Sequence, residues 1–321
     1  MKKIKILTLA AVLALAGFGL MHYFYPGSEV LFDIKEGSNG TQIARELKEQ
    51  RIIASTGWFR ALLHFTNARK RLRPGRYKLR THMSSEAVIW TLFHTDGKYY
   101  IRLGVPEGFR AEQIAEKLQS LGITKGDDFM KIVRDEKLEG QLFPSTYFMG
   151  EHVPARQVAD MMLHEFNAQV RPLLGGALPD GLNAQQVLTI ASIVEREAVV
   201  QEDRPLIAAV YINRLKKNML LEADPTVQYA LGYISQEKSW WKRRMLLGDL
   251  KVESPYNTYR YIGMPPGPIC NPGLDSVKAV LNPAPIAALY FVADRQGHHI
   301  FNEDYKEHLK AKHLVEMQSA R

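Results

Sequence analysis

Two carboxylates stand in an otherwise apolar stretch, the segment VLTIASIVEREA from Val187 to Ala198. At about 3.6 residues per turn, its apolar side chains cover most of the helix circumference, so we expect a mostly buried helix with Glu195 and Glu197 within or beside the apolar face. Burial disfavours the charged form of a carboxyl group and raises its pKa, so that the group can hold a proton near neutral pH. Such a group can act as a general acid towards a leaving group.

The same acids have a simpler interpretation. A glutamate on a helix pairs with a nearby base more often than it takes part in catalysis, and Arg196, Arg204 and Arg214 are close in sequence. Periodicity does not choose between Glu195 and Glu197. Because they are two residues apart, their side chains point about 160° away from each other and cannot act on the same bond.

The N-terminal region has the composition of a membrane anchor. Lys2, Lys3 and Lys5 precede an uncharged run over residues 6–25, which is long enough to cross a bilayer and ends in aromatic residues. A cleaved signal peptide is the alternative, but its apolar core is normally shorter and ends at small residues. We predict a single transmembrane helix in the cell inner (cytoplasmic) membrane, with residues 1–5 cytoplasmic and the rest of the chain periplasmic or extracytoplasmic.

Composition bounds the size and the possible partners of the protein. A chain of 321 residues, 46% hydrophobic and 24% charged, is long enough for two globular domains. Its net charge of +8 permits nucleic acid, an anionic membrane surface or an acidic polymer as partner. The basic segment from Arg69 to Lys78 could contact any of these, although a solvated loop is the commoner explanation.

No metal or other cofactor is expected. His298, His299 and His308 lie near the C-terminus, but no HExxH or CxxC spacing accompanies them. Cys270 is the single cysteine and cannot form an internal disulfide, so oxidation does not constrain the fold.

Residues 29–97 alternate short β-type runs with amphipathic helical runs, which predicts a small α+β module. An internal repeat crosses its boundary, because Glu36-Gly37 and Glu107-Gly108 are each followed at identical spacing by Gln, Ile, Ala and Leu, at an offset of 71 residues. Each copy indicates a strand, a glycine turn and a helix start. The repeat is equally well explained as a common packing unit.

Two further helices are predicted after the central one. Asp203 and Pro205 supply an N-terminal cap and a first-turn proline for LIAAVYINRLKK. Asp224 and Pro225 begin a third helix, and Gly232 ends it. The loop that follows, from Ser254 to Gly273, is long and rich in Pro, Gly, Asn and Tyr, as functional loops often are.

Several motifs, in this order and spacing, resemble those of the MltG or YceG-like endolytic murein transglycosylases. They are ASIVEREA (Ala191 to Ala198), INRL (Ile212 to Leu215), DPTVQYALG (Asp224 to Gly232), SPYNTY (Ser254 to Tyr259), GMPPGPICNPG (Gly263 to Gly273), LYFVAD (Leu289 to Asp294) and GHHIF (Gly297 to Phe301). The resemblance implies an α+β fold: a LysM-like α+β subdomain over residues 29–97, after the transmembrane helix, and a mixed α/β YceG-like catalytic domain over residues 98–321.

The resemblance also implies an activity. A lytic transglycosylase of this family cuts the β-1,4 bond between N-acetylmuramic acid and N-acetylglucosamine in nascent peptidoglycan strands and leaves 1,6-anhydro ends, which would terminate strand elongation. One glutamate acts first as acid and then as base, and the first Glu of the ASIVE motif places that role on Glu195. The expected partners are glycan strands, the membrane and peptidoglycan synthases, and no nucleic acid.

The matched motifs nominate five further residues for substrate binding: Gln228, Tyr256, Asn257, Thr258 and His299. Departures from the family pattern are small and spare Glu195; they are Arg196 where Lys is usual, Ser145 where Asp is common, Met264 where Leu is usual, and Cys270. Two other classes of function remain open. One is a non-catalytic peptidoglycan-binding scaffold, and the other is an anchored nucleic-acid-binding protein.

Overall fold

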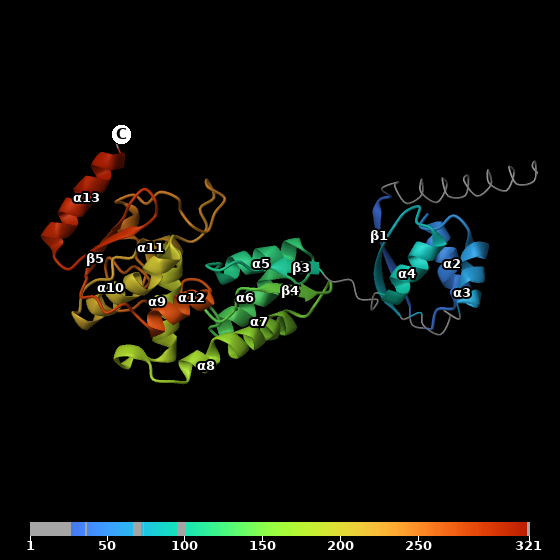
Figure 1. Ribbon diagram of the computed structural model, residues 1–321, viewed down its shortest axis with the longest axis horizontal. Coiled ribbons are helices and arrows are strands. Elements are labelled where there is room, and N and C mark those ends of the chain that lie inside the picture. The colour runs from blue at the N-terminus through green and yellow to red at the C-terminus, as the bar shows by residue number, and fades with distance from the viewer. Residues whose placement is uncertain (1–26, 36, 67–71, 73, 95–100, 320–321) are drawn as a thin grey trace, which may run out of the picture. The chain divides into compact units, whose positions relative to one another are not determined.

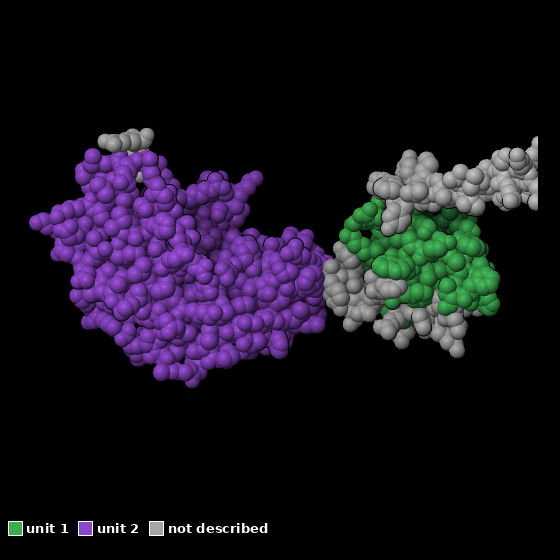
Figure 2. Space-filling model, in the orientation of Figure 1, with its two compact units in different colours: residues 1–100 green, residues 101–321 purple. Residues whose placement is uncertain are grey.

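The chain forms two compact units, residues 1–100 and residues 101–321 (Figure 1, Figure 2). Helices and strands are mixed in both. The described strands pair antiparallel in three separate two-stranded sheets. The computed structural model describes residues 27–35, 37–66, 72, 74–94 and 101–319.

Unit 1 packs three helices against one sheet. The strands pair so that Phe32 lies opposite Tyr77, and both side chains are buried in the core of this unit. The resemblance of residues 29–97 to a LysM subdomain stays a prediction. Its elements are β1 (Glu29–Ile34), α2 (Gly40–Glu49), α3 (Thr56–Phe65), β2 (Gly75–Arg80) and α4 (Ser85–His94).

Unit 2 contains two hydrophobic cores. The first, which we call the α5–α7 core, lies among one sheet and three helices and is built from Leu103, Ile114, Phe129 and Met162 with their neighbours. The strands pair from Ile101 opposite Met149 to Gly104 opposite Thr146. The elements are β3 (Ile101–Gly104), α5 (Ala111–Ser120), α6 (Gly126–Asp135), β4 (Thr146–Met149) and α7 (Ala155–Gln169).

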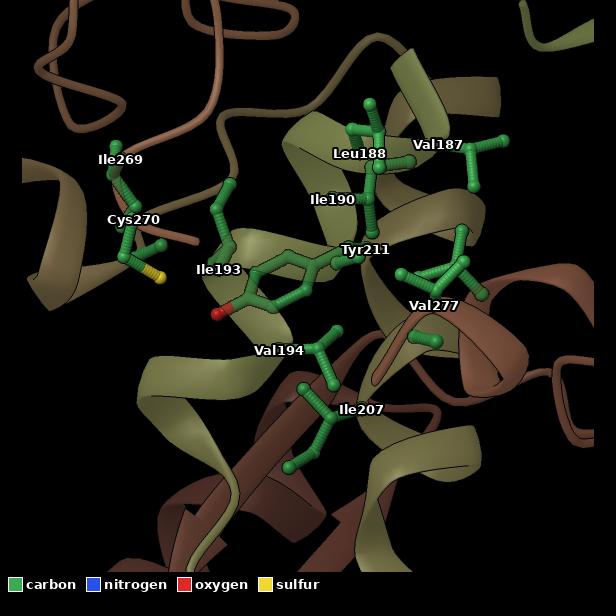
Figure 3. Close-up of a cluster of buried hydrophobic side chains, with 14 of the residues drawn as sticks. Val187, Leu188, Ile190, Ile193, Val194, Ile207, Tyr211, Ile269, Cys270 and Val277 are labelled. Atoms are coloured by element: carbon green, nitrogen blue, oxygen red, sulfur yellow. The ribbon is translucent and has the colours of Figure 1, made fainter. Parts of the chain in front are cut away.

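The second core, the α9 core, surrounds the helix that carries the two acids. Figure 3 shows Tyr211 and Val277 from neighbouring helices, and Cys270 from the loop that precedes α12, gathered with the apolar side chains of α9. Its elements are α8 (Arg171–Leu174), α9 (Ala184–Glu197), α10 (Arg204–Lys216), α11 (Asp224–Leu231), α12 (Leu274–Leu281), β5 (Tyr290–Ala293), β6 (His299–Asn302) and α13 (Tyr305–Ser319), with short 3-10 turns η2 (Pro179–Gly181), η3 (Gln201–Asp203) and η4 (Asp249–Lys251).

The predicted helices after α9 are confirmed, with one difference in how they begin. Pro205 lies in the first turn of α10, and Gly232, at φ +71°, ends α11 as expected. Asp203 does not cap α10 through its side chain. Its carboxylate instead accepts hydrogen bonds from the backbone and the ring of His299, both at 2.8 Å.

Both copies of the sequence repeat adopt a glycine turn followed by a helix. Gly37 has φ +79° and Gly108 has φ +74°, a region of backbone conformation that glycine adopts without steric cost. The helices that follow, α2 and α5, each bury the Ile, Ala and Leu of the motif. The first copy packs in unit 1 and the second in the α5–α7 core.

The predicted transmembrane helix, and with it the predicted single-pass location in the inner membrane, is corrected by the structure. Within the described residues, no helix is long and apolar enough to cross a membrane. The longest, α7 and α13, have 15 residues each and carry charged side chains, whereas a span needs about 20 apolar residues. Residues 6–25, on which the prediction was placed, lie outside the described residues.

The β5–β6 hairpin is fastened to α10 by a buried arginine. Arg214 donates from Nε to the carbonyl of Leu289 at 2.7 Å, and from Nη1 to the carbonyls of Leu220 and Leu221 at 3.1 and 3.0 Å. Its Nη1 also pairs with Glu222 at 2.9 Å. Because the hairpin carries His299, this one side chain helps to position the residues around Asp203.

We expect Arg214→Met to lower the free energy of unfolding by about 3 kcal/mol, because buried carbonyl groups lose their donor while the side chain keeps its length. Urea unfolding followed by circular dichroism measures the change. Arg156→Met is the matched control, since Arg156 forms its ion pairs with Glu136 and Asp160 at the surface. Equal urea midpoints for the two variants would contradict this role of Arg214.

Candidate active site

The helix that carries the two acids is buried on nearly every side. Asn183 caps it: its side-chain oxygen accepts a hydrogen bond from the backbone N–H of Gln186, and the side-chain oxygen of Gln186 accepts one from the backbone N–H of Asn183. All eight residues from Val187 to Val194 are buried. The helix ends at Glu197, so both carboxylates belong to its last turn, where the apolar packing gives way to polar neighbours.

Glu195 is held at the N-terminus of α12. Its Oε2 accepts hydrogen bonds from the backbone N–H of Gly273 at 3.0 Å and from the hydroxyl of Ser276 at 2.8 Å. Its Oε1 lies 3.6 Å from Nη2 of Arg204. The side chain is 7% exposed. Unpaired backbone N–H groups and the helix dipole favour negative charge at such a position.

Arg204 is itself fixed by neighbours. Its Nε donates to the hydroxyl of Ser276 at 3.1 Å, so that Arg204 and Glu195 share one serine. The preceding residue, Asp203, accepts the two hydrogen bonds from His299 and joins α10 to β6. The guanidinium group therefore stays beside the carboxylate without a direct hydrogen bond to it.

A second carboxylate, that of Glu107, lies against the same turn. A β-carbon built on Gly273 would be 1.9 Å from Oε1 of Glu107, so the carboxyl group occupies the space that a side chain at Gly273 would need. Burial, and then the charge on Glu195, raise the pKa of Glu107; Asp275 adds to the effect and Arg204 opposes it. The residue as a whole is more exposed than Glu195, but its carboxyl group lies against Gly273.

Asn271 ties the loop that bears Glu107 to the loop before α12. Its backbone accepts from the N–H of Gly108 at 3.0 Å and donates to the carbonyl of Phe109 at 2.8 Å. Its side-chain oxygen accepts from the N–H groups of Gly140 and Leu142 at 2.9 and 2.8 Å. One buried amide therefore holds together three segments that are far apart in sequence.

The same amide meets a buried acid. Nδ2 of Asn271 donates to Glu139 at 2.9 Å, and the N–H of Ala111 donates to the same carboxyl group at 3.1 to 3.2 Å. Burial, with a smaller contribution from the charge on Glu112, raises the pKa of Glu139 to about 8. This carboxyl group is therefore protonated at neutral pH and stabilises the junction as a neutral hydrogen-bonding group.

Aromatic and guanidinium groups complete the junction between the two cores. The guanidinium of Arg196 lies 4.0 Å from the ring centre of Trp241, whose Nε1 donates to Gln113 on α5 at 2.9 Å. The guanidinium of Arg110 lies 4.1 Å from the ring centre of Tyr229 and 4.7 Å from that of Trp240. These contacts are polar or cation–π in character, in contrast to the apolar packing inside each core.

Glu197 has different neighbours from Glu195, in agreement with the opposite directions expected on the helix. The hydroxyl of Tyr211 on α10 donates to its Oε1 at 2.9 Å. Burial raises the pKa of Glu197 to about 7, although the hydrogen bond from Tyr211 opposes the change. This acid is engaged with α10 and does not share the contacts of Glu195 with α12.

The five nominated substrate-binding residues lie in several places. Among the residues that the structure describes, none of them hydrogen-bonds or ion-pairs with Glu195. Gln228 donates to the carbonyl of Lys242 at 2.7 Å, and the ring of Tyr256 packs on Tyr229 at 4.7 Å between centres. His299 is connected to the site through Asp203, next to Arg204.

Asn257 and Thr258 are buried inside the loop that was expected to present them. Asn257 donates to the carbonyls of Leu250 and Val252, both at 2.9 Å. Thr258 meets the hydroxyl of Thr226 at 2.8 Å. Their side chains therefore anchor the loop to the segment before it and to α11, although their motif nominated them for substrate binding.

Two hollows lie near these elements. A cavity of about 250 Å³ is lined by Arg204, the ion-pair partner of Glu195, and its other polar lining residues are Gln201, Asp275, Lys278 and Asn282. A larger hollow of about 570 Å³ is lined by the predicted loop, including Tyr261 and Met264. Figure 2 also shows unit 2 hollowed beside its projecting loop. Within the described ranges, no group of three His, Cys, Asp or Glu residues could hold a metal ion.

Residues 32–313 match the YceG-like family. The chain belongs to this family. The YceG-like chain is 33% identical, over 88% of its length and 84% of the relative's, to a Bacillus subtilis (strain 168) protein named endolytic murein transglycosylase. It is 31% identical to a protein of the same name from Streptococcus pneumoniae serotype 2, strain D39, covering 83% of this chain and 54% of that one, so it spans about half the length of the streptococcal relative.

A solved structure is similar as well. The crystal structure of a putative YceG-like protein from Listeria monocytogenes is 30% identical and aligns with a TM-score of 0.58, covering 88% of this YceG-like chain and 98% of that one. The resemblance seen in the motifs is therefore confirmed as a family relationship.

Sequence reasoning missed several residues of this YceG-like site. Glu107 was noticed only as part of the repeat, and Asn271, Gly273 and Ser276 were noticed only as part of a loop or not at all. Arg204 was one of three bases considered as partners of the two acids, and it is the one that lies beside Glu195. The available signal for Glu107 was its place in the glycine turn of the repeat. A tight turn holds an acidic side chain at a fixed position.

We expect Glu139→Gln to change the stability of this YceG-like chain in a pH-dependent way. The pKa of Glu139 is raised in the folded state to about 8 from an ordinary value of 4.5, so the unfolded chain loses this proton first as pH rises. Between those values the wild type loses about 1.4 kcal/mol of unfolding free energy per pH unit through this group, and the variant does not. Through this group, the variant should gain no free energy of unfolding over the wild type below about pH 4.5. Above about pH 8 its gain should be constant.

Urea unfolding of both proteins at about pH 5, 7 and 9 measures this difference. Asp128→Asn, which removes an exposed acid in the first turn of α6, is the control and should give a difference that does not change with pH. A Glu139→Gln difference that is equally flat would show that Glu139 ionises normally.

Proposed function

We propose that this chain cuts the bond between N-acetylmuramic acid and N-acetylglucosamine within peptidoglycan strands, with Glu195 as the general acid. Its family makes the chain a lytic transglycosylase with a role on peptidoglycan. The finer proposal is carried by one observation. The acid of the matched motif lies in the last turn of a buried helix, is held by Gly273 and Ser276, and pairs with Arg204, which lines a polar cavity.

The two oxygens of Glu195 have different tasks in this proposal. Oε2 accepts two hydrogen bonds, so the transferable proton belongs on Oε1. When that proton passes to the oxygen of the leaving sugar, a carboxylate remains. The N–H of Gly273, the hydroxyl of Ser276 and the positive charge of Arg204 then stabilise it without rearranging.

The cavity beside Arg204 is the proposed seat for one sugar next to the bond that is cut. Its volume of about 250 Å³ and its amide groups from Gln201 and Asn282 suit the hydroxyl and acetamido groups of an amino sugar. The 6-hydroxyl of the muramic acid then attacks its own C1 and closes a 1,6-anhydro ring, while its proton passes to the Glu195 carboxylate, so the acid is restored and no water is consumed.

The remaining nominated residues support the site in different ways. Tyr256, which is partly buried against Tyr229, is proposed to offer its aromatic ring to the glycan. Gln228, Asn257 and Thr258 are proposed to act indirectly, by fixing the loops, and His299 by fixing Asp203. Unit 1 is proposed as a LysM-like glycan-binding part, in which Trp58 and Trp90 are exposed.

We expect Glu195→Gln to lower turnover by about 10² to 10⁴, because the amide keeps the shape but has no proton to donate. Glu197→Gln keeps an acceptor for the Tyr211 hydroxyl, so its turnover should stay within about threefold of the wild type, far less than the loss of a general acid. Both variants are assayed on uncross-linked glycan strands, and mass spectrometry quantifies the 1,6-anhydro ends.

Thermal melts of the same samples show whether each variant is folded. An inactive but folded Glu197→Gln beside an active Glu195→Gln would reassign the acid. A wild type that releases no anhydro product would refute the proposed activity. If in addition it binds strands without cutting them, it would favour the non-catalytic scaffold.

A further inference from the structure

Arg196, the residue after the proposed acid, has hydrogen-bond donors that the fold does not use. It is partly buried, and its Nε is fully buried without a hydrogen-bond partner. Within the described part of the chain, its two terminal nitrogens form no hydrogen bond and no ion pair. One face of the guanidinium group packs on the ring of Trp241, whose centre lies 4.0 Å away. Because the five N–H donors of a guanidinium lie in its plane, this stacking leaves them without acceptors.

Two buried arginines of unit 2 show how such a group can be satisfied. Arg110 also packs on aromatic rings, yet its Nε and Nη2 donate to Glu112 at 2.7 and 3.0 Å, and its Nη1 donates to the carbonyl of Tyr229 at 3.3 Å. Arg214 donates to three backbone carbonyls and to Glu222. A partly buried cation without such acceptors is costly, which indicates that a ligand supplies them at Arg196.

The free donors of Arg196 lie close to the acid. A β-carbon built on Gly108 would be 3.2 Å from Nη1 of Arg196 and 3.6 Å from Cγ of Glu195. Gly108 takes φ +74° and leaves room for both side chains. Arg204, the other cation beside the acid, is already engaged with Ser276 and with Glu195 itself. Arg196 is therefore the cation that a substrate at Glu195 can use.

The sugar that reacts carries one group that suits a guanidinium. N-acetylmuramic acid differs from N-acetylglucosamine by a lactyl group on C3, in the same ring as the C1 that is attacked. In strands without peptide stems this group ends in a carboxylate, and in strands with stems one oxygen remains as an amide carbonyl. A guanidinium binds a carboxylate through two parallel N–H···O bonds, which are stronger than those to neutral acceptors. The hydroxyl and acetamido groups of the sugar are neutral and need no cation.

We propose that Arg196 determines substrate specificity by binding the lactyl carboxyl group of the muramic acid whose C1 is attacked. This inference rests on the proposed function and deepens it, because it explains how the site accepts muramic acid in this position and rejects N-acetylglucosamine. Arg196 transfers no proton, so Glu195 remains the single acid and base. Trp241 holds the guanidinium plane before the substrate arrives, which reduces the conformational entropy that is lost on binding.

We expect Arg196→Gln to raise KM for stem-free strands by about tenfold and to keep kcat within about threefold of the wild type, because the lost bonds hold the bound substrate and the transition state alike. On strands whose lactyl carboxylates have been converted into methylamides, KM should rise by at most about threefold, since the wild type meets only a neutral acceptor there. The full chain is assayed, and mass spectrometry counts the anhydro ends.

Two further variants separate charge from shape. Arg196→Lys keeps the charge but loses the planar fork, so its KM for stem-free strands should lie between those of the wild type and Arg196→Gln. It carries the same comparison of the two kinds of strand if thermal melts show that Arg196→Gln is unfolded. Arg134→Gln removes an exposed cation from the last turn of α6 and is the matched control, which should leave both KM values unchanged.

An equal rise in KM on both kinds of strand, or no rise on either, would refute recognition of the lactyl carboxyl group. Failure of the proposed function is a different result, in which the wild type forms no anhydro ends. Binding tests Arg196 without turnover. Calorimetric titration of stem-free strands into Glu195→Gln should give an affinity about tenfold higher than into the same variant with Arg196→Gln added, and equal affinities would overturn the inference.

Discussion

The arrangement of the site depends on one carboxylate that lies at the start of a helix. Glu195 leaves an apolar helix and meets the N–H of Gly273 and the hydroxyl of Ser276 at the first turn of α12. An acid in such surroundings requires partners, since an unpaired buried charge is expensive. Because Glu195 needs these partners, α12, the loop before it and Arg204 must lie next to the end of α9. Ser276 bonds both Glu195 and Arg204, so it links α9, α10 and α12 in one polar cluster.

A network of uncharged hydrogen-bonding groups around Asn271 lies next to this charged cluster. Asn271 satisfies backbone groups at Gly108, Phe109, Gly140 and Leu142 and also binds Glu139, whose raised pKa keeps it protonated near neutral pH. Every atom of this amide is used, which suits a low-dielectric junction where an unpaired polar group would be costly. Neutral hydrogen bonds there position Glu107 without adding another charge beside Glu195.

Local sequence patterns predicted much of the secondary structure. They could not predict the site, because the site depends on contacts between segments that are far apart in sequence. The helices α9, α10 and α11 follow from apolar periodicity and from Pro205, Pro225 and Gly232, which act through neighbouring residues. Glu107 and Asn271 could not be placed in the same way, because their importance arises from segments that meet only in the folded chain. Asn257 was nominated for substrate binding by its motif, yet it is 0% exposed and its amide satisfies the carbonyls of Leu250 and Val252 just before the loop.

Glu107 and Glu195, the two acids next to Gly273, belong to segments that pack in different hydrophobic cores. Glu107 follows β3 of the α5–α7 core, and Glu195 ends the central helix of the α9 core. Between these cores lie hydrogen bonds such as that from Trp241 to Gln113, and apolar contacts continue along α7, because Met162 packs in the α5–α7 core and Phe166 of the same helix packs in the α9 core. The position of one carboxylate relative to the other therefore depends on how the two cores pack together. Because α7 contributes buried side chains to both cores, that packing is a continuous part of unit 2.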